Sequence, residues 1–201
     1  MATSARILEF ESPLASSRCT PVSFRGTEYI NNLFSFNVGL VAGEDPIEPE
    51  ELLGQQVTVK VISGDLEQSF HGVVCGFTET EPEGDDTFEY EVELVPRLWL
   101  LGLNSHNRIF AEMTTLDIVE QVVQGACEMP LQDSTMKSYA VRETCCQYNE
   151  TDLAFVQRLL AEEGISYCFK HTESTTTMVL ADSMDGMPDC APRDYPYKER
   201  E

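Results

Sequence analysis

Two adjacent cysteines, Cys145 and Cys146, stand just before a helix-like run of residues, and His171 follows that run. Cysteine and histidine are common zinc ligands, and a reactive thiol could also serve redox chemistry. A zinc site needs thiolates that converge on one ion, typically with a C-x-x-C spacing, and the chain contains no such pair. Adjacent strand residues point to opposite faces of a sheet. The sequence therefore predicts that Cys145 and Cys146 are packing residues of a strand.

The other candidate metal ligands lack a suitable spacing too. His71, His106 and His171 have no second ligand four residues away on a helix, which favours surface or partly buried hydrogen-bonding histidines. The acidic stretches EPEGDD (81–86) and DSMDGMPD (182–189) offer carboxylates and a glycine, but neither has the frame of a calcium-binding loop. Cation binding at these stretches is the less favoured alternative. We therefore expect no bound metal and no cofactor.

Sequence frames of known catalytic sites are missing. The chain has no G-x-S-x-G elbow, phosphate-binding glycine loop, H-E-x-x-H pair or dinucleotide fingerprint. Aspartate and glutamate total 35 residues, so a glycosidase-like pair could be drawn from many of them and their abundance carries no information. We predict a protein that is not an enzyme and has no catalytic residue. A lysozyme-type hydrolase remains an unsupported alternative.

The charge and the apolar runs restrict the partners. With 13 basic and 35 acidic residues, the 201-residue chain has a formal net charge of −22, which repels nucleic-acid phosphate and anionic lipid. The densest apolar run, LWLLGL (98–103), is far too short for a membrane span, and MATSARILEF (1–10) lacks the build of a signal peptide. Seven scattered cysteines are typical of reduced thiols in the cytoplasm. We expect no nucleic-acid partner and no membrane segment.

The first half of the chain shows the period-two pattern of half-buried strands. Apolar residues alternate with polar ones over residues 34–40, 57–61 and 88–94, and the last of these runs has glutamate at every second position. Weaker strand candidates cover residues 6–10, 21–24 and 69–77, and turn-rich stretches separate the runs. Six or seven short strands in under 100 residues predict a small antiparallel, tube-like β-barrel.

Helical periodicity appears in the second half. Thr114 and Asp117 have the spacing of a helix-capping pair, and the run after them ends before a proline. A second helix has Asn149 as its candidate cap, and Thr151 and Asp152 are also suited to a helix start. Gly164 suits the left-handed C-terminal position of this helix. The expected apolar stripes are Leu116, Val119, Val123 and Ala126 in the first helix and Leu153, Phe155, Val156, Leu159 and Leu160 in the second.

Two strands follow the second helix, over residues 165–171 and 175–182. The sequence thus predicts an α+β fold that is mainly β, with a β-barrel domain over residues 1–97 and a small α+β domain with two helices over residues 98–201.

Several long segments carry a recognisable pattern, over residues 22–40, 51–61, 69–77, 95–123 and 142–171. The last contains an Arg-x-x-x-x-Gln-Tyr-x-Glu-[ST]-Asp stretch followed by an LLxEEGIxYxFxH segment. Together these segments resemble the N-terminal, phage-tail-hub-like region of VgrG proteins. In that pattern the positions of the two adjacent cysteines hold varied residues. The positions that carry the resemblance most clearly are Pro96, Arg97, Leu98, Trp99, Gln147, Tyr148, Glu150, Asp152, Glu163 and Gly164.

The resemblance implies a structural component of the type VI secretion spike. In this family two tube-like barrels per chain form a pseudo-sixfold ring in the trimer, which adapts the hexameric tube protein, Hcp, to a trimeric needle for effector delivery. The implied partners are further copies of the chain, Hcp, and baseplate and effector proteins. The implied route is assembly in the cytoplasm and then secretion through the apparatus without a signal peptide.

Two other functions remain open, and so does the extent of the chain. A contractile prophage or tailocin tail hub would use the same architecture, and a peptidoglycan-hydrolysing spike enzyme is an alternative of a different class. Members of the family continue into a second barrel and a β-helix needle, whereas this sequence stops within the hub region, as an excised fragment or a natural truncation. We expect it to be a monomer or weak oligomer.

Overall fold

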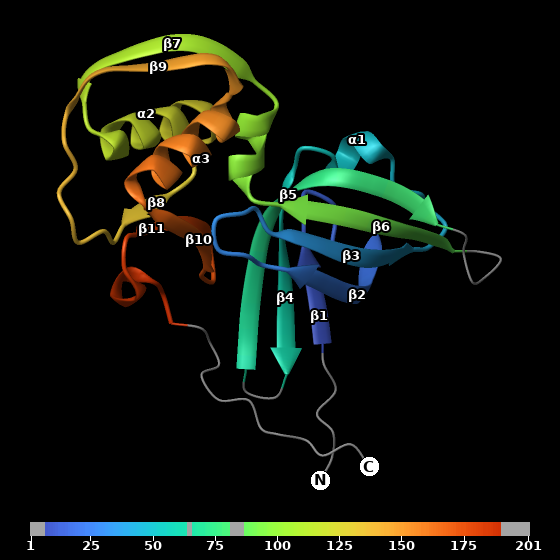
Figure 1. Ribbon diagram of the computed structural model, residues 1–201. Helices are drawn as coiled ribbons and strands as arrows, with labels where there is room; N and C mark the ends of the chain where they lie inside the picture. Colours follow the sequence, from blue (N-terminus) through green and yellow to red (C-terminus); the bar gives the residue numbers. More distant parts are fainter. Residues whose placement is uncertain (1–6, 64–65, 81–86, 190–201) are drawn as a thin grey trace.

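The computed structural model describes residues 7–63, 66–80 and 87–189, and the acidic stretch 81–86 therefore lies outside the described residues (Figure 1). The first part of the chain forms a six-stranded antiparallel sheet with the strand order β1-β4-β5-β6-β3-β2. Its outer strands β1 and β2 contact each other, so the sheet is a nearly closed barrel. The strands are β1 (Ile7–Glu11), β2 (Cys19–Thr27), β3 (Ser35–Ala42), β4 (Gln56–Ser63), β5 (Leu66–Thr80) and β6 (Phe88–Val95).

The alternating sequence pattern accounts for the two surfaces of this barrel. In β3 every second residue, starting at Phe36, is buried, and the residues between them are only partly covered. In β6 the glutamates at 89, 91 and 93 lie on the outer side, whereas Val92 and Leu94 are fully buried. The tube-like barrel predicted from the sequence is confirmed, and the protein is mainly β as expected.

The long strand β5 serves two neighbours. Its first half pairs with β4 and its second half with β6, and the register shifts between Val74 and Gly76. Cys75 is the extra residue of this β-bulge, a feature that bends a strand and increases its twist. The bend lets one continuous strand turn the sheet toward closure, which is why a barrel forms from only six strands.

The second part of the chain folds as an α+β unit. Its elements are η1 (Arg97–Gly102), β7 (Ser105–Met113), α2 (Thr115–Cys127), β8 (Leu131–Asp133), β9 (Arg142–Thr151), α3 (Asp152–Glu163), β10 (Ser166–His171), β11 (Thr176–Ala181) and η2 (Met184–Gly186). Figure 1 shows the two-stranded β7–β9 ribbon on one side of the two helices and the three-stranded sheet, in the order β10-β11-β8, on the other.

The ends of both long helices follow the local sequence signals. Thr114 accepts a hydrogen bond from the Asp117 backbone N–H, and the Asp117 carboxylate accepts one from the Thr114 N–H. Thr151 caps α3, and Gly164 ends it in the left-handed conformation at φ 69°. The prediction of Asn149 as the cap of this helix is wrong: Asn149 lies inside β9 with φ 52°.

Several elements differ from the sequence expectations. The turn-rich stretch 42–51 contains the start of a short helix, α1 (Pro49–Leu52), and the strands β7 and β8 had no clear period-two signal. In α2 the buried face is Ile118, Val119, Val122 and Val123, so Ala126 is exposed rather than part of the stripe. Tertiary packing decides which side of a helix rich in β-branched residues is buried, and the sequence period defines that side only to within one residue.

One continuous hydrophobic core joins the two parts of the molecule. Phe34 of the barrel is fully buried, and its ring lies 5.3 Å from that of Phe169 in β10 and 4.5 Å from that of Phe36. Leu98 and Leu101 of η1 are fully buried in the same core. The barrel and the α+β unit therefore bury apolar surface against each other.

Candidate functional site

Three of the signature residues meet where β9 enters α3. Asp152 is only 1% exposed, and its Oδ1 accepts hydrogen bonds from Gln147 Nε2 at 2.7 Å and Arg108 Nη2 at 2.7 Å. His106 Nδ1 lies 3.0 Å from the same oxygen. Gln147 is fully buried, accepts from Arg108 Nε at 2.9 Å and donates to the Glu150 carbonyl. This buried polar network holds the turn from strand to helix.

The network decides the charge state of its central carboxyl. Burial alone would raise the pKa of Asp152, but hydrogen bonds from Gln147 and His106 and the positive charge of Arg108 outweigh burial. The pKa of Asp152 is consequently held below its ordinary value. A buried ionised carboxylate is stable only when it is paired and hydrogen-bonded, as this one is.

The sequence analysis did not identify the partners of this carboxylate on β7. His106 and Arg108 stand on the strand that pairs with β9, opposite Glu150 and Gln147. Arg108 lies in the 95–123 segment of the family resemblance, and that was the one signal available for it. Strand pairing brings the two stretches together, and neither a spacing nor a composition shows that pairing.

A second ionic cluster fastens β9 along α3. Arg142 Nη2 lies 2.6 Å from Glu163 Oε1 and Arg142 Nη1 lies 2.8 Å from Glu162 Oε2. Arg158 bridges Glu162 at 2.8 Å and Glu150 at 2.6 Å. Hydrogen bonds from Arg142 are the main cause that lowers the pKa of Glu162. The signature residues Glu150 and Glu163 are therefore arginine partners in this chain.

The outer face of the β7–β9 ribbon is the exposed counterpart of this network. Cys145 is buried opposite Phe110, whereas Cys146 is exposed opposite Ile109. The two thiols point to opposite faces, as predicted. The packing role holds for Cys145 alone, because Cys146 lies on the outer face together with Tyr148, which is 77% exposed.

The Pro96–Trp99 stretch connects the barrel to the α+β unit. Pro96 is buried and precedes the first residue of η1, and Leu98 is fully buried in the shared core. Trp99 is partly buried, and its backbone N–H donates a hydrogen bond to the Pro96 carbonyl. Arg97 is partly buried and donates to Gln56 Oε1 over 3.4 Å.

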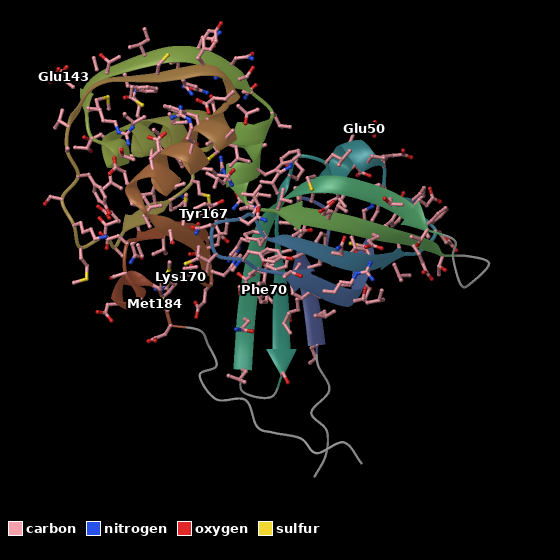
Figure 2. The ribbon with its side chains drawn as sticks, viewed as in Figure 1. Glu50, Phe70, Glu143, Tyr167, Lys170 and Met184 are labelled. Atoms are coloured by element: carbon pink, nitrogen blue, oxygen red, sulfur yellow. The ribbon has the colours of Figure 1, made fainter. Side chains whose placement is uncertain are left out.

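The junction between barrel and α+β unit carries specific polar contacts as well as apolar ones. Asn31, at φ 62°, donates its backbone N–H to the Tyr167 carbonyl at 2.8 Å and accepts from the Tyr167 N–H through its side-chain oxygen at 2.9 Å. These bonds cover the edge of β10 that faces the barrel. Figure 2 shows Tyr167 and Phe70 on the two sides of this junction.

Two of the three histidines lie at the same junction. His71 is 4% exposed. Its Nδ1 lies 2.8 Å from Thr58 Oγ1, and its Nε2 donates a hydrogen bond to the Thr172 carbonyl at 2.8 Å. His171 Nδ1 lies 2.7 Å from Thr176 Oγ1, and its ring packs 5.1 Å from that of Phe34. Both are partly or fully buried hydrogen-bonding histidines.

Of the two candidate ion-binding stretches, only residues 182–189 lie within the described part of the chain, and their first residue makes structural contacts. Asp182 accepts from the backbone N–H groups of Met136 and Lys137, each at 2.9 Å, and from the Tyr139 hydroxyl.

Burial raises the pKa of the Cys75 thiol to about 11, and the nearby Glu93 adds to the effect. Within residues 7–63, 66–80 and 87–189, no three side chains of histidine, cysteine, aspartate or glutamate gather as an ion would require.

Comparison with known proteins identifies the family of this fold. The family model for the phage tail baseplate hub (GPD) matches residues 27–201. This chain belongs to that family.

None of the helices in the described part of the chain has the length and apolar character needed to span a bilayer.

The relatives are spike proteins of type VI secretion. The chain is 32% identical over 179 residues to the type VI secretion system spike protein VgrG1c of Pseudomonas aeruginosa, which covers 89% of this chain and 24% of that protein. It is 30% identical over 210 residues to the actin cross-linking toxin VgrG1 of Vibrio cholerae, covering 98% of this chain and 19% of that protein. The chain thus spans about a quarter or less of these relatives.

A solved structure agrees with these sequence relatives. The E. coli c3393 protein, described as a type VI secretion component with structural similarity to the T4 bacteriophage tail proteins gp27 and gp5, superposes with a TM-score of 0.81 at 27% identity. The match covers 90% of this chain and 51% of that one. The VgrG resemblance inferred from sequence motifs is therefore confirmed, and the family-signature positions are distributed over one connected fold.

Proposed function

We propose that this chain is part of the hub of a type VI secretion spike and works as a scaffold rather than by catalysis. The similarity to the type VI spike protein VgrG1c over 89% of this chain is the observation that carries this proposal. The barrel, with residues 1–97, forms one wall segment of a ring, and residues 98–201 form the α+β unit that supports it. The division between the two lies at η1.

The proposed mechanism is mechanical. In the assembled spike, three copies place their barrels in a pseudo-sixfold ring that meets the hexameric tube protein Hcp on one side and a trimeric needle on the other. The outward glutamates of β6 keep the isolated barrel from associating at random, since like charges repel at low salt. Rigidity of the α+β unit, through the Asp152 network, keeps the barrel in register.

The proposed partners and location follow from this role. Besides itself and Hcp, the spike contacts baseplate and effector proteins, and it assembles in the cytoplasm before it leaves through the secretion apparatus. A contractile prophage or tailocin tail hub is the second candidate, because the c3393 structure is described as similar to T4 tail proteins.

A gene deletion in the bacterium that encodes the protein tests both candidates. We expect loss of Hcp from the culture medium and loss of killing of neighbouring cells, with both restored by the wild-type gene. The variant Asp152→Ala should restore neither, whereas Glu91→Ala should restore both. Normal Hcp release from the deletion strain, together with loss of tail particles after prophage induction, would assign the chain to a phage tail instead.

A zymogram with the purified chain tests the enzymatic alternative. We expect no clearing of peptidoglycan. Clearing that disappears when a single acidic residue is replaced would overturn the non-catalytic role.

A further inference from the structure

Arg97 stands out among the arginines of this acidic chain. Within the described residues, Arg18, Arg25, Arg108, Arg142 and Arg158 each lie within 4.0 Å of a carboxylate oxygen. Arg97 has no carboxylate partner in the same part of the chain, although acidic residues outnumber basic ones 35 to 13. Its one hydrogen bond goes to Gln56 Oε1, with a long distance of 3.4 Å.

The Nε atom of Arg97 is buried without a hydrogen-bond partner among the described residues. Two other buried nitrogens share that condition, but each has an ionic neighbour: Arg18 Nε lies 2.9 Å from Asp45, and His171 Nε2 lies 3.3 Å from Glu28. Buried polar groups are nearly always hydrogen-bonded, so this N–H leaves the Arg97 guanidinium with donor capacity that the described residues do not use.

A cavity of about 180 Å³ opens beside this guanidinium, between the barrel and the α+β unit. Gln56 and His71 line it from the barrel, Met129 and Glu128 from the segment after α2, and Arg97 from the start of η1. Such a volume holds far more than one water molecule. The site is thus a polar hollow at the junction rather than a crevice of the apolar core.

The donors that line this hollow suit an oxyanion. Guanidinium offers two parallel N–H groups that match the two oxygens of a carboxylate. Because Gln56 uses its carbonyl oxygen toward Arg97, its amide NH₂ is the end left to donate. Glu128 is the one acidic side chain of the lining; it is exposed and stays more than 4.0 Å from Arg97, so it does not neutralise the guanidinium.

We propose that this cavity binds a carboxylate group, held by Arg97 through two hydrogen bonds and by Gln56 through a third. The carboxylate comes from a small free acid or from an aspartate or glutamate side chain of a second copy of this chain. Ligand binding would bridge the barrel and the α+β unit at η1. The proposal goes beyond the scaffold role and does not depend on it.

The NMR signal of the Arg97 side-chain Nε–Hε group tests the proposal in the purified chain. Acetate is added up to about 0.1 M while chloride is withdrawn to keep the ionic strength, and thus charge screening, constant. We expect a saturable shift of this signal and of the Gly72 backbone amide, which lines the cavity. Arg97→Lys should weaken binding about tenfold, because lysine cannot form the two-pronged contact. Arg97→Gln should remove the Gly72 shift.

Arg25→Gln is the matched control, since Arg25 already pairs with Glu91 at 2.6 Å and lies outside the cavity. It should leave the acetate response unchanged. A dilution series without acetate identifies the source: a concentration-dependent Nε–Hε signal that acetate displaces means a second copy, and an unchanged signal with saturable acetate binding means a free acid. No saturable shift, or an equal Gly72 shift in Arg97→Gln, would overturn the proposal.

Discussion

The barrel and the α+β unit differ in how far their paired charged side chains are exposed to water. The barrel keeps charge outside: Arg25 and Glu91 pair across its outer surface with side chains 70% and 38% exposed. The α+β unit instead buries the acidic partner of an ion pair: Asp152 is 1% exposed, next to Arg108, whose side chain is 33% exposed. Loss of one partner should therefore cost little in the barrel, where water screens the charges. It should cost much more at Asp152, because its removal leaves partners of a buried carboxylate without their acceptor.

This difference also separates the family signature from the rest of the chain. Gln147, Glu150 and Asp152 belong to the polar network or its ionic extension, whereas the barrel needs only an alternation of apolar and polar residues. Many sequences satisfy an alternation, but few satisfy a set of mutual hydrogen bonds. A motif is therefore recognisable in the α+β unit and much weaker in the barrel.

Removal of the buried carboxylate should produce the largest effect. Asp152→Ala leaves Arg108 and Gln147 without their acceptor, and we expect a loss of about 3–5 kcal/mol in the free energy of unfolding. The matched change on the barrel, Glu91→Ala, should cost at most about 1 kcal/mol. Urea denaturation of both variants measures the difference. Equal losses in the free energy of unfolding would show that burial of the carboxylate makes no difference to its contribution.

The pH dependence of stability should reveal the same network with a smaller effect. The folded-state pKa of Asp152 is lowered below its ordinary value of 3.8, so its contribution is complete above that value and is lost as the pH falls through the folded-state pKa. Asp152→Asn should accordingly lose less stability than the wild type between about pH 5 and pH 2. Urea denaturation midpoints of both proteins across this pH range check the prediction. Parallel curves of stability against pH would contradict a lowered pKa of Asp152.

The two adjacent cysteines allow a buried and an exposed position to be compared within one strand. Cys145→Ser places a hydroxyl in the core opposite Phe110 and should cost about 1–3 kcal/mol. Cys146→Ser is on the exposed face and should change the free energy of unfolding by less than about 0.5 kcal/mol. Thermal unfolding of the two single variants decides it. A larger effect at Cys146 would mean that the outer face of the ribbon is covered.

The polar link across the junction should have the smallest effect. Asn31→Gly retains the left-handed backbone, which glycine adopts without strain. It removes the side-chain acceptor for the Tyr167 N–H and the longer bond, 3.3 Å, that the Asn31 amide donates to the Ser166 hydroxyl. We expect a loss of about 1 kcal/mol, the usual net value of a hydrogen bond. Hydrogen exchange at Tyr167 should accelerate more than exchange within α3. Unchanged exchange at Tyr167 would mean that the barrel does not protect this strand edge.

Sequence patterns predicted the parts of this fold that depend on local order. The strands of the barrel, the Thr114 cap and the Gly164 helix end all follow from spacing along the chain. Spacing could not predict that Arg108 meets Asp152, because 44 residues separate them and only the pairing of β7 with β9 brings them together. The junction at Asn31 was likewise invisible, since its partner Tyr167 lies 136 residues away.

The barrel and the α+β unit should behave as one body, because they share a core through η1 and the Phe34 cluster. Native-state hydrogen exchange in increasing urea tests this at Val38 in the barrel and Leu159 in α3, both fully buried. We predict that both amides exchange through the same global opening, with equal free energies and equal urea dependence. Exchange at Leu159 through a separate opening of lower free energy would contradict the claim and divide the chain into two independent units.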